Sequence, residues 1–199
     1  LQLATDYPHD MNFRLNWDRG YPENFQYIKF LWGGGLLFWI FIRRRHLPYL
    51  LLSGVLAYLL LDDANKIHEI IGGQLVMAYP NAGFWGINPQ DVAEFLTMVA
   101  FGSLILLLLA LSWFLSRLPE RRDVSPIVLL ILCIGFFAVV VDFAHGIVGS
   151  SPILDELFRI VEEGGEMISA TLLAAWIFCL ACRGQITAAR DEPEPQGKP

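Results

Sequence analysis

LDELFRIVEEGGEMISATLLAAWIFCLAC, residues 154–182, is a stretch of two unlike halves. From Met167 onward it is almost entirely apolar, and the whole stretch exceeds the roughly 20 residues with which a helix crosses a bilayer. The first half carries five carboxylates: Asp155, Glu156, Glu162, Glu163 and Glu166. Because an ionisable side chain in hydrocarbon costs roughly 2.5–3.5 kcal/mol, a span that keeps several is expected to use them. The stretch therefore predicts a transmembrane helix with a polar site at one end.

Four further segments are long and apolar enough to span a membrane: Phe25–Ile42, Pro48–Ile71, Pro89–Leu115 and Pro126–Val148. With 55% hydrophobic residues and a mean hydropathy of +0.48, the composition also favours a membrane protein. Proline begins three of these segments, as is common in the first helical turn, and Gly72 and Gly73 are expected to end the second. The sequence predicts an all-α integral membrane protein with five transmembrane helices.

Basic residues divide unevenly between the two ends of these segments. Nine of the 14, together with five of the 20 acidic residues, lie on the side that holds Arg43–Arg45 and the C-terminus. The opposite side, which holds the N-terminus, has the other five basic and 15 acidic residues. Because Lys and Arg at helix ends mark the cytoplasmic face, we expect the N-terminus outside and the C-terminus in the cytoplasm. The bacterial cytoplasmic (inner) membrane is the expected location.

The chain divides into three parts on this scheme. Residues 1–24 are aromatic and charged and are expected to lie on the outer membrane surface, with the 72–89 loop as a second cap there. Residues 25–183 form the five-helix transmembrane domain. Residues 184–199, which end in a Pro- and charge-rich stretch, are expected to be a disordered cytoplasmic tail.

Acidic groups of four segments fall at one height when the helical rise is counted from the cytoplasmic ends. Spacing places Asp62 and Glu69 on one helix face and turns Asp63 away, while Asp142 and His145 are adjacent at i,i+3. We expect an acidic pocket in the outer half of the second to fifth helices, with these metal ligands: Asp62, His68, Glu69, Glu94, Asp142, His145, Glu163 and Glu166.

A cation site is the interpretation that this pattern favours. Many carboxylates packed in a low dielectric cannot all stay ionised unless cations neutralise them or protons are taken up. Inward-facing acids with E-x-x-H-type spacings hold two metal ions in helical bundles, and oxygen and imidazole ligands suit Fe, Mn or Zn. The expected function is that of a metal-binding membrane protein, with an oxidoreductase or hydrolase acting on a lipid or small hydrophobic substrate as its expected activity.

Two other classes of function stay open. The same carboxylates could relay protons or cations in a transporter, although the cytoplasmic halves of the segments are nearly all apolar. The chain could also be an accessory subunit whose Gly-, Trp- and Phe-rich first helix packs on a partner in a larger membrane complex. Beyond the lipid bilayer and such a partner, no nucleic acid is expected, because the basic residues are helix flanks that the topology explains.

Overall fold

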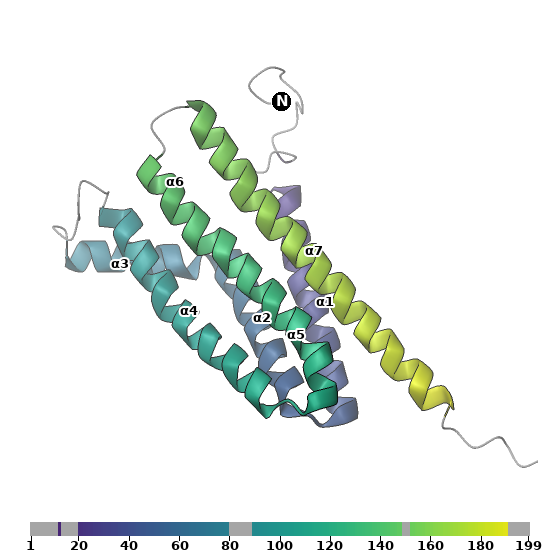
Figure 1. Cartoon of the computed structure of the whole chain (residues 1–199). Helices are drawn as coiled ribbons and strands as arrows, with labels where there is room; N and C mark the ends of the chain where they lie inside the picture. Colours follow the sequence, from purple (N-terminus) through teal and green to yellow (C-terminus); the bar gives the residue numbers. More distant parts are fainter. Residues whose placement is uncertain (1–11, 13–19, 80–88, 149–151, 191–199) are drawn as a thin grey trace, which may run out of the picture.

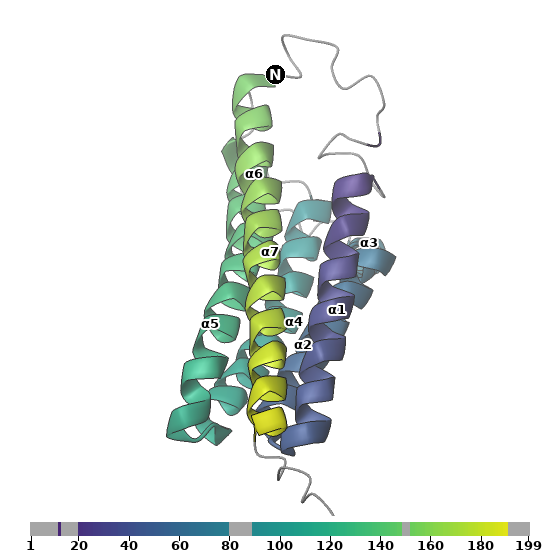
Figure 2. The same cartoon turned by 90° about the vertical axis from the view of Figure 1, so that its right-hand side faces the viewer.

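The computed structural model describes residues 12, 20–79, 89–148 and 152–190, and the regular secondary structure of these residues is entirely helical. Five helices are long and apolar enough to cross a membrane, which confirms the predicted all-α membrane architecture. They run alternately up and down as one bundle, in which α7 lies against α1 on one side and α5 on the other (Figures 1 and 2).

The first helix, α1 (Tyr21–Arg44), begins with Pro22 in its first turn and ends at Arg45, which adopts the left-handed conformation. Its glycines allow close packing inside the bundle. A Cβ added at Gly33 would lie 2.9 Å from Cδ1 of Leu56 in α2 and 3.4 Å from Cδ1 of Ile177 in α7. The glycine-rich segment is therefore used for contacts between helices of this chain.

We predicted a single second helix over Pro48–Ile71, and this prediction is wrong. The chain forms α2 (Leu47–Asn65) and α3 (Ile67–Ala78), separated by Lys66 at φ 51°, and α3 turns away from the direction of α2 (Figure 1). Gly72 and Gly73 lie inside α3 instead of ending a helix. A Cβ at Gly72 would lie 2.7 Å from Cγ of Glu94, so this glycine lets α3 approach the next helix closely.

The third predicted segment agrees with α4 (Pro89–Leu115), whereas the fourth begins earlier than expected. It is α5 (Leu118–Gly135), with Pro119 in the first turn and Pro126 in its interior. The six-residue π-helix η2 (Phe136–Val141) and α6 (Asp142–Val148) continue it.

The last helix, α7 (Pro152–Arg190), is longer than predicted, and it includes residues 184–190 of the expected tail. Residues 1–11, 13–19, 80–88, 149–151 and 191–199 lie outside the described part of the chain. They hold most of the predicted outer-surface segment, half of the predicted 72–89 cap and the end of the tail, so those predictions stay predictions.

The two ends of the bundle differ in charge. We call the end that holds the start of α2 and α5 the basic end, and the end that holds the start of α4 and α7 the acidic end. Close to the basic end the helices enclose a core of fully buried apolar side chains. Its members with no exposed surface are Leu37, Tyr49, Leu52, Val55, Val124, Ile127 and Ile177.

Candidate functional site

A cavity of about 640 Å³ extends into the bundle from the acidic end, and every one of the helices α1 to α7 and η2 contributes to its wall. Eleven polar or charged side chains line this cavity: Gln26, Tyr58, Asp62, Asp63, His68, Glu69, Glu94, Ser103, Asp142, Glu162 and Glu166. The remainder of the wall is almost wholly apolar, and no lysine or arginine belongs to it among the described residues.

The structure brings six of the eight predicted site residues to this one cavity: Asp62, His68, Glu69, Glu94, Asp142 and Glu166. The other two, His145 and Glu163, do not line it. Asp63 was expected to point away, and this is wrong, because its side chain belongs to the wall. Glu162 and Gln26 also line the cavity and were not among the predicted ligands.

Asp62 joins α2 to α3 at the break in the chain. The backbone N–H of Lys66 donates to the carbonyl of Asp62, and one carboxylate oxygen of Asp62 accepts the backbone N–H of His68 at 3.1 Å. The other oxygen lies 3.1 Å from Nδ1 of His68. This hydrogen bond to Asp62 raises the pKa of His68 above its ordinary value, although partial burial works against the charged form. Asp62 and His68 thus form one charge-assisted pair at the cavity wall.

Helix α1 contributes a polar face that our prediction left out of the site. Nε2 of Gln26 donates to Oε2 of Glu166 at 3.0 Å, and Gln26 is only 7% exposed. One turn further, Nζ of Lys29 donates to the carbonyl of Met167 at 3.3 Å. The signal in the sequence is this pair of polar residues, three apart and therefore on one face, inside an otherwise apolar span.

Glu69 and Glu94 lie where α3 packs on α4. Glu94 contacts Gly72 and accepts a hydrogen bond from Nε2 of Gln90. Glu69 pairs with Lys66 at 3.2 Å, and its side chain is 42% exposed, so this carboxylate lies at the rim of the cavity.

The π-helix η2 sets the direction of the residues that follow it. Such a segment fits extra backbone into each turn, which rotates the next side chains relative to an uninterrupted α-helix, and single π-helical turns are frequent at functional sites. Asp142 follows η2 directly and lines the cavity. Gly165 of α7 allows the ring of Phe137 to pack closely, since an added Cβ would lie 2.5 Å from it.

His145 is held between two carboxylates of α7. Its Nε2 lies 2.8 Å from Oδ1 of Asp155, and its Nδ1 lies 3.5 Å from Oε2 of Glu162. Arg159 also donates to Asp155, at 3.3 Å. The predicted ligand His145 therefore contacts the cavity only through Glu162, whose position it helps to fix.

The carboxylates surround the cavity and do not converge on one point. Among the residues that the structure describes, no three His, Cys, Asp or Glu side chains lie close enough together to hold a metal ion. The arrangement is a ring of oxygen donors around an open volume, contributed by α2, α3, α4, α6 and α7.

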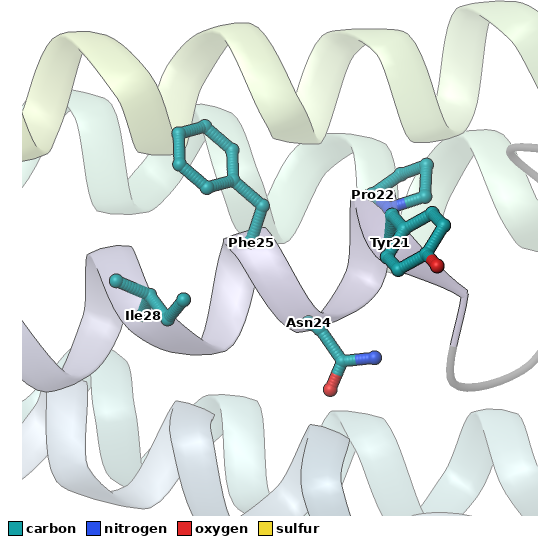
Figure 3. Close-up of a pocket in the computed structure, with 5 residues that line it drawn as sticks. All are labelled: Tyr21, Pro22, Asn24, Phe25 and Ile28. Atoms are coloured by element: carbon teal, nitrogen blue, oxygen red, sulfur yellow. The ribbon is translucent and has the colours of Figure 1, made fainter. Parts of the chain in front are cut away.

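A second hollow, lined by Tyr21, Pro22, Asn24, Phe25 and Ile28, lies along the start of α1 (Figure 3). All five residues come from one helix, and the wall is apolar apart from Asn24 and the hydroxyl of Tyr21. This hollow has no polar groups that converge from several elements, so we assign no ligand to it.

The chain matches a family described as "Domain of unknown function (DUF8692)" over residues 20–182. The chain belongs to the DUF8692 family. The match to DUF8692 begins at the residue before α1 and ends inside α7, so it includes four of the candidate membrane spans, all but the last residue of the fifth, and every residue of the cavity wall. No curated protein and no solved structure matches the chain significantly.

Proposed function

We propose that this chain is an integral membrane protein that binds one or two metal cations in the carboxylate-lined cavity, as the site of a hydrolase or oxidoreductase. One observation carries the proposal. Seven carboxylates of five helices line a single cavity whose described wall has no lysine or arginine.

Electrostatics supports a cation in this place. Carboxylates that share a partly buried volume repel one another, and each loses hydration when its helix enters the membrane. His68 and Gln26 in the wall, with Lys66 paired to Glu69 at the rim, are too few to balance seven acidic groups. A bound cation would offset this repulsion directly, and oxygen ligands with one imidazole suit Fe, Mn or Zn.

The ligands that fit best are five cavity carboxylates, all of which lie inside the spans. Asp142, Glu162 and Glu166 belong to α6 and α7, and Asp62 and Glu94 belong to α2 and α4. Because these groups surround the volume, the longer glutamate side chains would move inward to meet an ion. A bound metal supplies Lewis-acid polarisation or activates water or oxygen. In this scheme His145 holds Glu162 in place, as residues behind metal ligands commonly do.

The distribution of charge supports an orientation as well. Arg43, Arg44, Arg117, Arg121 and Arg122 all lie at the basic end, and the cavity lies toward the other end. By the positive-inside rule the basic end faces the cytoplasm, so the cavity lies toward the outer, periplasmic side of a bacterial inner membrane in our proposal.

A transporter using the same carboxylates is supported less well. Between the cavity and the basic end, the helices pack fully buried apolar side chains such as Leu52, Val55 and Ile127 against one another. Among the described residues this core has few polar side chains, those of Tyr49 and Ser112 among them, and its buried apolar cluster includes no carboxylate that could relay a proton or cation. An accessory role through α1 has some support, because Trp32 and Trp39 are exposed on its outer surface.

The decisive experiment is metal analysis of the full chain, purified in mild detergent from cells supplied with Fe, Mn and Zn. We expect one or two transition-metal ions per chain, and a loss of most of this metal in the double variant Asp142→Asn/Glu166→Gln. Glu156→Gln is the matched control, because Glu156 is an acid of the same helix that does not line the cavity. Metal that is absent from the native chain after all three supplies, or metal that the double variant retains, would overturn the proposal.

A further inference from the structure

The cavity wall has a second, apolar part that a metal site does not need. Large hydrophobic side chains of α4, α5 and η2 line it, among them Val99, Leu106, Leu132, Phe136 and Val140. These five side chains keep large exposed fractions of 43%, 54%, 41%, 52% and 53%. This part of the wall is therefore not covered by other side chains, and it lies within two of the candidate membrane spans.

Two glycines in this part of the wall leave space instead of filling it. A Cβ added at Gly102 of α4 or at Gly135 of α5 would meet no atom within 4 Å. Both glycines line the cavity. The helices α4 and α5–η2 therefore border a part of the cavity that side chains leave unfilled, inside two candidate membrane spans.

We infer that a single-chain amphiphile, a lipid-like molecule with one alkyl chain and an oxygen-bearing polar head, enters the cavity sideways from the bilayer between α4 and α5–η2. Its chain lies along the apolar wall and its head reaches the carboxylates. This inference rests on the proposed function, because it names the class of molecule that shares the cavity with the metal ion.

The size of the cavity supports such an occupant. Sites for small organic ligands measure roughly 300–1,000 Å³, and a water molecule occupies about 30 Å³ in the liquid. One or two metal ions with a few waters would leave most of the 640 Å³ empty. An apolar wall this extensive gains free energy when an alkyl chain covers it, at about 25 cal/mol for each Å² removed from water.

The carboxylates at the polar part of the cavity determine which head group can bind there. An anionic head alone would be repelled by the seven carboxylates, whereas a hydroxyl can donate a hydrogen bond to a carboxylate and its oxygen can also approach a bound metal ion. A neutral head that bears a hydroxyl therefore fits this cavity with or without the metal.

Photo-crosslinking in lipid nanodiscs tests the inference, with a long-chain fatty alcohol that carries a photoreactive diazirine on its alkyl chain. The informative targets are Leu109, Ile131 and Ile134, which line the cavity but are only 2–3% exposed. A probe that stays in the bilayer cannot reach them. We expect these three to be labelled well above Ile127 and Ile177, which are fully buried in the core outside the cavity.

Gly102→Trp and Gly135→Trp should block entry between α4 and α5–η2 and remove most of this internal labelling. Gly35→Trp is the matched control, since a Cβ at Gly35 on α1 also meets nothing within 4 Å and this glycine does not line the cavity. Labelling of Leu109 and Ile131 no higher than that of Ile127, or labelling unchanged by both tryptophans, would overturn the inference. Metal analysis of the same samples separates the two proposals. Metal without internal labelling removes only this inference, and internal labelling without metal removes only the metal site.

Discussion

The two ends of this bundle differ in how their carboxylates are paired with basic side chains. At the basic end, Oδ2 of Asp123 pairs with Arg44 at 3.2 Å and its backbone carbonyl accepts Nε1 of Trp176 at 3.0 Å, while Glu120 pairs with His46. Each of these two acids has a basic side chain as its partner. At the acidic end seven carboxylates share one cavity, whose described wall has one histidine, His68, and no lysine or arginine. The acids at the first end are matched one to one, whereas at the second end His68 and, at the rim, Lys66 face seven carboxylates.

Side-chain packing also differs between the two ends, and it is tighter at the basic end. Leu52, Val124 and Ile127 near the basic end have no exposed surface, whereas Val99, Leu132 and Phe136 of the cavity wall are 41–52% exposed. A protein interior is normally filled to crystal-like density. The basic half is therefore the densely packed part of the bundle, and the acidic half encloses the cavity.

The largest effect that this comparison predicts is on core packing. Ile127→Ala should lower the free energy of unfolding by about 2–5 kcal/mol, because a fully buried side chain leaves a cavity when it is truncated. Leu132→Ala, one and a half turns away in the exposed part of the wall, should cost less than about 1 kcal/mol. Denaturation of both variants in detergent checks this, and equal losses would contradict the division into a packed and an open half.

A smaller effect is expected where α7 meets η2. Gly165→Ala should cost about 1–3 kcal/mol, because its Cβ would lie 2.5 Å from the ring of Phe137 and either the ring or a helix must shift. Gly164→Ala is the neighbouring control, since a Cβ there meets nothing within 4 Å, and it should be neutral or stabilising. Thermal unfolding of the two variants measures the difference. Equal melting temperatures would mean that η2 is not held against α7 as described.

Neutralising one acid at each end should have opposite outcomes. Asp123→Asn should destabilise the metal-free protein by about 1 kcal/mol, because it weakens a charged contact that is partly exposed. Glu166→Gln should leave the melting temperature unchanged or raise it, because it removes one member of a crowded acidic set and can keep a hydrogen bond with Gln26. Unfolding in the presence of a chelator tests both. A loss from Glu166→Gln as large as that from Asp123→Asn would show that the acidic end is already balanced.

Much of this fold could be predicted because hydropathy decides membrane spans. Long apolar segments are sufficient to place the five helices, and Pro89–Leu115 agrees with α4 in both bounds. The break at Lys66 could not be predicted in the same way. Its left-handed backbone is unfavourable for a lysine, and it is stabilised by contacts of Asp62 with the next helix that periodicity does not reveal.

The site was predictable to a similar degree. Asp62, Glu94, Asp142 and Glu166 lie at similar heights along their helices, and this height was enough to predict that they share one cavity. Helical spacing alone gave the wrong direction for some neighbouring side chains. Asp63 reaches the wall although it is adjacent to Asp62, because α2 ends two residues later. The six-residue π-helix shifts the residues after it, and His145 turns to α7 instead of the cavity. Local changes of backbone conformation therefore decide which acids line the site.

The smallest effect concerns pH and the pair formed by His68 and Asp62. Since this hydrogen bond raises the pKa of His68 in the folded state, folding favours the protonated imidazole. The resulting stability is complete below the pKa of the unfolded chain, about 6.5, and is lost as the pH rises through the higher folded-state pKa. Compared with a His68→Gln variant, the native protein should become relatively less stable as the pH rises above about 6.5, which a series of melting temperatures would measure. Asp62→Asn removes the partner and should flatten the same profile. A native advantage that grows with pH would contradict the pairing, because it would mean that the neutral imidazole is the form that the folded chain prefers.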